Sequence, residues 1–330
     1  MITPFSWLAH RFAFGRRALR IAATGALLAS VLIIVTGGVV RVTGSGLGCT
    51  EWPACTPGTL GPTAEMGVHG LIEFGNRLLT GVLCAVVGWL IVVARLQKNP
   101  APGVTRMAWA QFWIIGLNAV VGGITVWVRL NPYIVAAHFV AASLLVTAAT
   151  IAWHRALSVD SAEPGTSSAL ASRLSVGMVV STALLIIVGT IVTGAGPHAG
   201  HSAEVERIPV PWAIATGGHV VVAVVTMALG VFLWVVVVMD GSNAVLKRRT
   251  GTFLVVLIIQ GLIGVVQVVT HLAELVVVLH LLGSILVWIG ALRVLFASRP
   301  RLRVGDSDRQ HVTQNGEREM GPQVSHAARA

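Results

Sequence analysis

The sequence predicts an all-α polytopic membrane protein with eight transmembrane helices, arranged as two pseudo-symmetric four-helix bundles. Three observations lead to this fold class. Hydrophobic residues make up 55% of the 330 residues and charged residues only 11%, less than half the share of about 25% in typical soluble domains. Apolar runs of about twenty residues, long enough to cross a bilayer, recur along the chain. Two motifs recur in its two halves.

Eight apolar runs are long enough to cross a bilayer. They are continuous rather than alternating in polarity, and only helices or closed barrels satisfy the backbone within lipid, so each run is expected to be a helix. The expected helices cover residues 21–40, 68–94, 108–127, 133–153, 174–193, 212–238, 252–270 and 276–296. The basic residues before the first run resemble the start of a signal peptide, but the run exceeds a signal core and is expected to be a retained helix.

Basic residues are distributed unevenly between the two sides of the membrane. With the N-terminus inside, nineteen of the 23 Lys and Arg residues lie in cytoplasmic segments, and only Arg41, Arg129 and Arg207 lie in outer loops. This follows the positive-inside rule, and an even number of helices returns the C-terminus to the cytoplasm. We therefore expect a multi-pass cell-membrane protein whose net charge of +10 faces anionic membrane lipid and not nucleic acid.

Polar segments divide the chain into five expected parts. These are a cytoplasmic N-terminus over 1–20, an N-terminal four-helix half over 21–157, a cytoplasmic linker over 158–173, a C-terminal four-helix half over 174–298, and a tail over 299–330. The tail is mixed in charge and poor in apolar residues, so we expect it to be disordered.

The two halves share two spaced motifs. Gly122 and Gly264 each stand 16 residues before a histidine, His138 and His280, at an offset of 142. The tetrapeptide TGSG after the first span is similarly matched by TGAG after the fifth. Four helices separate the repeats, so both halves have the same orientation, and we expect a pseudo-twofold axis along the membrane normal.

Ionisable residues are rare inside the apolar runs, where they are costly and usually mark a site. Glu73 is the only acid well inside a run, and Arg77 is the only basic residue there. The two are spaced i,i+4 and, with His69 and Asn76, form one polar stripe on the second helix. The stripe either fastens helices through a self-neutralising ion pair or belongs to a functional site, and we favour the site.

Four of the eleven histidines lie inside apolar runs, near the outer third of even-numbered helices: His69, His138, His219 and His280. A single membrane histidine is often no more than a hydrogen-bonded packing residue. Several at similar depth on facing helices favour metal or haem ligation, because two imidazoles take both axial positions of a haem iron. Three further histidines lie in outer loops: His198, His201 and His271. We expect them to be solvated, and the alternative is a role at the haem edges.

Two of the three cysteines share the first outer loop. An oxidising exterior allows a disulfide between Cys49 and Cys55, which five residues separate. The alternatives are two free thiols or a metal site, and a disulfide is favoured because the loop offers no neighbouring ligands. Cys84 lies within the second helix and is expected to be an inert buried thiol.

Three segments of the chain resemble haem A synthases. The first outer loop over 40–55, VRVTGSGLGCTEWPAC, resembles the first outer loop of that family. The segment 72–77, IEFGNR, resembles its second-helix motif, and 193–200, TGAGPHAG, is similar to its loop after the fifth helix. Together with eight spans in two halves, the likeness covers nearly the whole chain apart from the tail.

The resemblance implies an enzyme that oxidises the C8 methyl of haem O to a formyl group by successive hydroxylations, which yields haem A for cytochrome oxidase. It implies haem b in the C-terminal half, with His219 and His280 on its iron. It also implies a substrate haem O in the N-terminal half near His138 and Glu73. A haem O synthase and an electron-transfer protein are the expected partners. The paired outer cysteines match the family's cysteine-bearing bacterial branch, where a redox role has been proposed.

One position departs from the family pattern. The commoner second-helix motif is Glu-x-x-His-Arg, but this chain has Asn76 where the histidine stands. Asn76 matches His219 at an offset of 143, so the substrate half lacks one expected ligand. His69 is a candidate replacement, although it lies about 10 Å away along the helix axis. The substrate iron is then either held by His138 alone, with His69 as an outer ligand or proton carrier, or held by both.

The expected catalytic group is Glu73, a carboxyl that burial and Arg77 tune to take or deliver protons. Arg77 and Asn76 are expected to contact the substrate haem. A di-haem cytochrome that exchanges electrons with quinone would use the same histidines, but it requires neither Glu73 nor the first-loop motif. A transporter built from repeats would use broken helices near the midplane. The glycines here instead suggest close packing of helix faces, as at Gly81, Gly88, Gly261 and Gly264.

Overall fold

The computed structural model describes residues 12–98, 101–158, 167–198, 200–201, 205–241 and 243–299. Within these residues the chain forms eight long helices, a short 3₁₀ helix and no named strand. The elements are α2 Arg16–Val42, η1 Ala64–Met66, α3 Gly67–Arg95, α4 Pro102–Trp127, α5 Pro132–Ser158, α6 Ala169–Ala195, α7 Trp212–Asp240, α8 Ala244–Val269 and α9 Glu274–Ser298. Most of the expected tail, N-terminus and linker lies outside the described residues.

The eight expected spans are confirmed as helices, and each is long and apolar enough to cross a membrane. At two helices a polar cap sets a start that precedes the apolar run. Ser168 accepts the N–H of Ala171 at the start of α6, so residues 169–173 are helical. Asn243 similarly accepts the N–H of Leu246 and starts α8. Serine and asparagine are among the strongest N-caps. No described helix is broken midway, unlike those expected of a repeat transporter.

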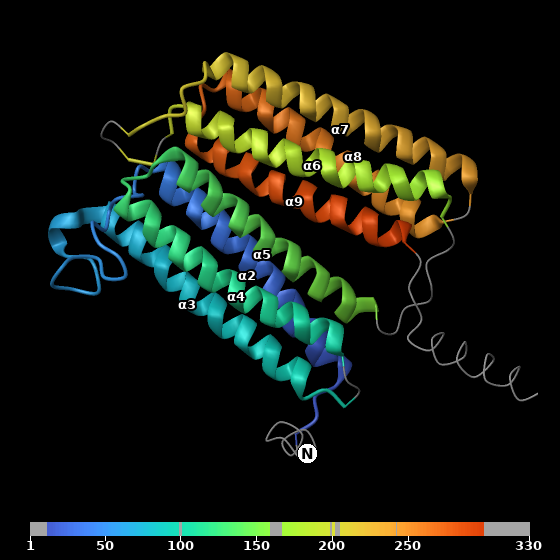
Figure 1. Cartoon of the computed structure of the whole chain (residues 1–330), viewed down its shortest axis with the longest axis horizontal. Coiled ribbons are helices and arrows are strands. Elements are labelled where there is room, and N and C mark those ends of the chain that lie inside the picture. The colour runs from blue at the N-terminus through green and yellow to red at the C-terminus, as the bar shows by residue number, and fades with distance from the viewer. Residues whose placement is uncertain are drawn as a thin grey trace, which may run out of the picture.

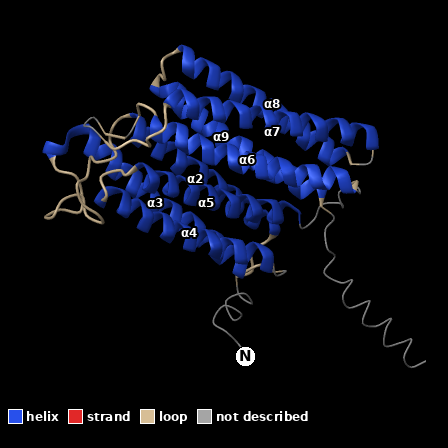
Figure 2. Ribbon diagram, turned by 45° about the horizontal axis from the view of Figure 1, so that its top comes forward, coloured by secondary structure: helices blue, strands red, loops and turns tan. Residues whose placement is uncertain are grey.

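Two four-helix halves lie side by side with their helices roughly parallel (Figures 1 and 2). One half contains α2 to α5 and the other α6 to α9. In each half consecutive helices pack together and the first packs against the fourth. The second and fourth helices, α3 with α5 and α7 with α9, therefore stand diagonally. The halves meet where α2 and α5 contact α9 and where α5 contacts α6. This arrangement agrees with the expected pseudo-symmetric bundles.

The internal repeat extends into the helices. Residues 32–35 of α2 and 185–188 of α6 both read LIIV. This identity places Thr36 of α2 at the position of Gly189 of α6, an offset of 153. The loop motifs at residues 43 and 193 give a different offset, 150. The difference arises because the first half has three more residues than the second between LIIV and the TG motif.

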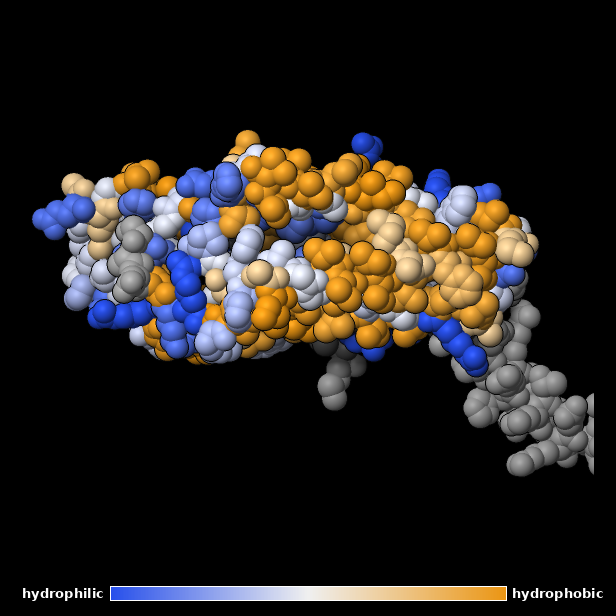
Figure 3. All heavy atoms as spheres, turned by 90° about the horizontal axis from the view of Figure 1, so that it is seen from above, coloured by the Kyte–Doolittle hydropathy of each residue, from blue (hydrophilic) through white to orange (hydrophobic). Residues whose placement is uncertain are grey.

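Side chains are packed most tightly at the end of each half that lies away from the first outer loop. The two main core clusters include Leu90 and Val104 in the first half and Leu233 and Leu246 in the second, all close to the α3–α4 and α7–α8 connections. Figure 3 shows an apolar exterior over the helical region and hydrophilic residues gathered toward the looped end. The histidines singled out above lie toward that looped end, near the starts of α3, α5, α7 and α9.

Candidate functional site

His219 of α7 and His280 of α9 face each other across the C-terminal half. Their ring centroids are 6.4 Å apart and the ring planes are inclined by 59°. Two imidazoles that bind one iron atom from opposite sides, each nitrogen about 2 Å from the metal, have ring centres about 6.3 Å apart. The spacing of this pair therefore suits one haem iron held between two diagonal helices.

A helical glycine lies beside each of three membrane imidazoles. The pairs are Gly122 with His138, Gly189 with His219 and Gly264 with His280, and a Cβ on the glycine would lie 3.0, 3.2 and 3.4 Å from the ring carbon Cε1, respectively. Unstrained carbon contacts are about 3.5–4.0 Å, so a Cβ at Gly122 or Gly189 would crowd the ring, whereas a Cβ at Gly264 would lie in contact with it. We call the three glycines the imidazole seats, because each lets a ring lie close to a neighbouring helix.

The expectation of close packing at four glycines is wrong for three of them. A Cβ at Gly81, Gly88 or Gly261 would meet no described atom within 4 Å. Gly81 and Gly261 are exposed, so they lie on outward faces rather than at helix contacts. Of the four, only Gly264 is an imidazole seat.

The seated imidazoles share an unusual polar environment. Nδ1 of His138, of His219 and of His280 is buried without a hydrogen-bond partner among the described residues. The carbonyl of Leu185, one turn before Gly189, lies toward His219 but makes no hydrogen bond of ordinary geometry with Nδ1. Buried polar atoms are normally paired, so packing through hydrogen bonds does not explain these rings. A metal bound through Nε2 would give the rings a polar role, and at His219 the Leu185 carbonyl lies where it could orient Nδ1–H.

Valine in place of Gly189 is expected to displace the His219 ring and reduce the haem bound per chain. Valine in place of Gly177, on the same helix, is the matched control, because a Cβ there meets no atom within 4 Å and lies about 18 Å further along the axis. Both variants place a valine inside the same helix, so the effect of valine on helix stability is the same in both. Haem absorbance per purified chain measures the effect, and equal losses in the two variants would rule out the seat.

Asn76 occupies the position in the N-terminal half that His219 occupies in the C-terminal half. The hydroxyl Oγ1 of Thr36 lies 2.7 Å from Oδ1 of Asn76. Thr36 itself stands where α6 has Gly189. A threonine–asparagine pair therefore replaces a glycine–histidine pair, and only His138 remains as a seated imidazole in this half.

Glu73 and Arg77 form the ion pair that their spacing predicts, with Oε1 and Nη2 2.5 Å apart. Oε2 of Glu73 accepts the backbone N–H of Cys49 at 2.8 Å. Arg77 donates to the carbonyls of Glu51 and Ala54 at 2.9 and 3.0 Å. The pair thus fastens the first outer loop to α3, rather than one helix to another, and Glu73 is only 6% exposed.

The disulfide between Cys49 and Cys55 is confirmed. Both cysteines are fully buried, and Sγ of Cys55 lies 3.5 Å from Sδ of Met66. A thiol from outside the protein would therefore have to open the loop before it could exchange with this bond. Cys84 is a free, partly buried thiol.

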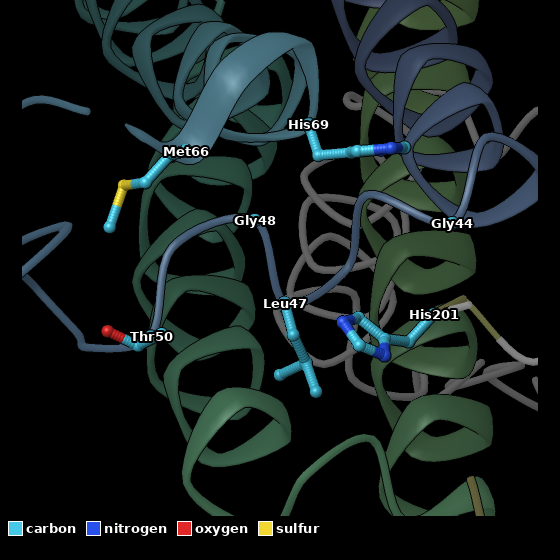
Figure 4. A pocket seen from close by; sticks show the side chains of 7 residues that line it. All are labelled: Gly44, Leu47, Gly48, Thr50, Met66, His69 and His201. Atoms are coloured by element: carbon cyan, nitrogen blue, oxygen red, sulfur yellow. The ribbon is translucent and has the colours of Figure 1, made fainter. Parts of the chain in front are cut away.

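His69 lies apart from Asn76, at the exposed outer end of α3. Its Nδ1 is 2.9 Å from Oγ of Ser45. With His201 it lines a pocket of about 270 Å³ (Figure 4), which also includes Gly44, Leu47, Gly48, Thr50 and Met66. Figure 4 shows His69 and His201 on opposite sides of the loop segment that carries Gly44 and Leu47.

The expectation of solvated loop histidines is correct for His271, which is exposed, but wrong for His198 and His201, which are half-buried. Nε2 of His198 is 2.9 Å from the Leu272 carbonyl, and the His198 carbonyl accepts from Nε of Arg41 at 2.8 Å. These contacts join loops that are distant in sequence, so spacing gave no signal for them. Within the described residues, these contacts hold parts of the loops together at the histidine end.

Comparison with known proteins gives a consistent match. The profile of the COX15-CtaA family, described as cytochrome oxidase assembly protein, matches residues 20–292. Three relatives are each named heme A synthase. The relative from Staphylococcus saprophyticus is 28% identical over 127 residues, which is 38% of this chain and 41% of the relative. The relative from Geobacillus thermodenitrificans is 30% identical over 119 residues, 34% of this chain and 35% of the relative. The relative from Listeria welshimeri is 29% identical over 120 residues, 34% of this chain and 37% of the relative. The matched part of the chain thus spans about two fifths of the relatives' length or less.

Proposed function

The chain belongs to the COX15-CtaA family of cytochrome oxidase assembly proteins, and on this basis we propose that it is a haem A synthase. It oxidises the C8 methyl of haem O to a formyl group by successive hydroxylations. The observation that carries the proposal is the buried Glu73, which pairs with Arg77 and accepts from the first outer loop, because a di-haem cytochrome would not require it. The His219–His280 pair, with its 6.4 Å spacing, suits the haem that such an enzyme would also hold. The names of the three relatives support the same activity.

Haem b is the proposed cofactor of the C-terminal half, where His219 and His280 would hold its iron. When bound, it supplies one-electron redox chemistry. The seats at Gly189 and Gly264 keep both rings close to neighbouring helices, so the ligands are positioned before the cofactor arrives.

The proposed substrate site lies in the N-terminal half around His138. The imidazole of His138, seated on Gly122, would hold the iron of haem O, with Asn76 and Arg77 near it on α3. Glu73 would take protons from the reacting methyl region and return them through its carboxyl oxygens. Its burial at 6% exposure supports this role, because water is largely excluded around it.

The two proposed sites adjoin each other across the seam between the halves. A Cβ at Gly38 of α2, two residues after Thr36, would overlap the side chain of Leu281, which follows His280 on α9. The Leu281 side chain thus lies directly against the backbone of α2. This contact supports electron transfer between the substrate site and the His219–His280 site without an intervening carrier.

In the proposed setting the protein lies in the cell membrane with both termini in the cytoplasm and the disulfide loop outside. The charge asymmetry of its loops supports this orientation. A haem O synthase that delivers substrate and an electron-transfer protein are the proposed partners.

Haem analysis of membranes tests the function. Membranes from cells that supply haem O are expected to contain haem A only when this chain is expressed. The His138→Ala variant is expected to lose haem A formation, whereas the His271→Ala variant, changed at an exposed loop position, is expected to keep it. Haem b without any haem A in membranes with the unaltered chain would instead indicate a di-haem cytochrome.

A further inference from the structure

Each half has two positions that match a ligand position in the other half, and the halves differ at one of these two. In the C-terminal half both imidazoles are seated on glycines. In the N-terminal half His138 keeps this arrangement, but Thr36 and Asn76 stand where Gly189 and His219 stand in the repeat. Because α3 and α5 are diagonal, as α7 and α9 are, the pseudo-symmetry puts Asn76 across from His138.

The hydrogen bond between Thr36 and Asn76 determines which part of the amide remains available. Oγ1 of Thr36 is 2.7 Å from Oδ1 of Asn76 and 3.1 Å from the carbonyls of Leu32 and Ile33. A hydroxyl has a single proton to donate, and the shortest contact receives it. The Asn76 carbonyl oxygen therefore already accepts one hydrogen bond, and its amide NH₂, from which no described residue accepts, remains a donor.

We infer, on the basis of the proposed function, that His138 alone holds the iron of the haem in the N-terminal half, and that the opposite axial position stays open to a small exogenous ligand beside the Asn76 amide. A neutral amide is not among the side chains that commonly ligate haem iron, whereas a hydrogen-bond donor in a distal pocket favours binding of small ligands. The C-terminal half has two imidazoles at ligating distance and leaves no such position.

His69 does not supply the missing ligand. Its Nδ1 is bonded to Ser45, and its side chain lies in the outer pocket with His201. It is also seven residues before Asn76, about 10 Å along the axis of α3. The helix would have to slide by nearly two turns to bring its imidazole to the position opposite His138.

Carbon monoxide is a suitable probe, because it binds ferrous haem only at an open axial position. The experiment uses the purified full chain loaded with haem in both halves and reduced. We expect about one CO bound per chain, at the haem on His138, while the His219–His280 haem stays low-spin and unreactive. The low-spin spectrum also reports in every variant that the chain is folded.

A double variant tests the equivalence of the two halves directly. Thr36→Gly together with Asn76→His rebuilds the Gly189–His219 pair, and it is expected to lower CO binding by about ten-fold or more while a second low-spin haem appears. Asn76→His alone is expected to have a smaller effect, because Thr36 then crowds the new ring. The His69→Ala variant is expected to bind as much CO as the unaltered chain.

Four results would overturn the inference, and they point to different errors. If the unaltered chain binds no CO but His69→Ala does, His69 is the second ligand, and the proposed function still stands. If the double variant still binds CO in full, position 76 does not face the iron. If His138→Ala keeps a CO-reactive haem, or if the chain takes up only one haem, the substrate placement itself is wrong and the inference fails with it.

Discussion

Alanine in place of His280 is expected to abolish the low-spin haem b spectrum. His280 and His219 are 6.4 Å apart, and removal of either imidazole leaves an iron with one protein ligand. The His219→Ala variant should therefore give the same result. A reduced-minus-oxidised spectrum of the purified chain, with haem measured per chain, provides the readout.

The control for this prediction is the loop histidine His271, which is exposed. Its alanine variant is expected to keep the full low-spin spectrum. A retained low-spin spectrum in the His280→Ala variant would mean that the iron is held elsewhere, and the C-terminal site would have to be abandoned.

Glutamine in place of Glu73 is expected to lower the rate of haem A formation by about 100-fold or more, the usual range for loss of a general acid–base group. Glutamine keeps the size of the side chain and an oxygen that can accept the Cys49 N–H, but it cannot carry a proton. The His219–His280 haem should be unaffected. The rate is measured as haem A formed from haem O in membranes with equal amounts of protein.

Arg77→Gln is the matched comparison, because it breaks the same ion pair from the other side. If Glu73 serves only to fasten the outer loop, the Arg77→Gln variant should lose at least as much activity and expose the loop to protease at least as much, because it also loses the bonds to the Glu51 and Ala54 carbonyls. If the carboxyl moves protons, the Glu73→Gln variant should be far slower than the Arg77→Gln variant. Normal haem A formation in the Glu73→Gln variant would remove this residue from the mechanism.

The features that the sequence predicts well are local. Apolar runs define the eight helices, since each run must satisfy its own backbone in lipid. The ion pair of Glu73 and Arg77 follows from i,i+4 spacing within one helix. The disulfide joins Cys49 and Cys55 within one short loop. In each case the partners are close in the chain, so spacing alone limits their geometry.

The features that the sequence does not predict depend on contacts between distant segments. The Oε2 atom of Glu73 bonds a loop N–H that is 24 residues away, and His69 meets Ser45 across the same separation. Nothing in the sequence marks Gly189, because its contact with His219 forms only when α6 and α7 pack together. Conversely, Gly81 and Gly261 resemble packing glycines in sequence but lie on exposed faces.

Glu73 and Arg77 together clamp the first outer loop to α3, and they contact mainly main-chain atoms of that loop. Arg77 binds the carbonyl oxygens of Glu51 and Ala54, and Glu73 binds an N–H. Every amino acid supplies a carbonyl, so the identity of residues 51 and 54 is irrelevant to the clamp. Evolutionary drift and deliberate redesign can therefore act on those two positions, for instance to introduce a fluorescent label or an antibody epitope, while positions 73 and 77 tolerate no such freedom.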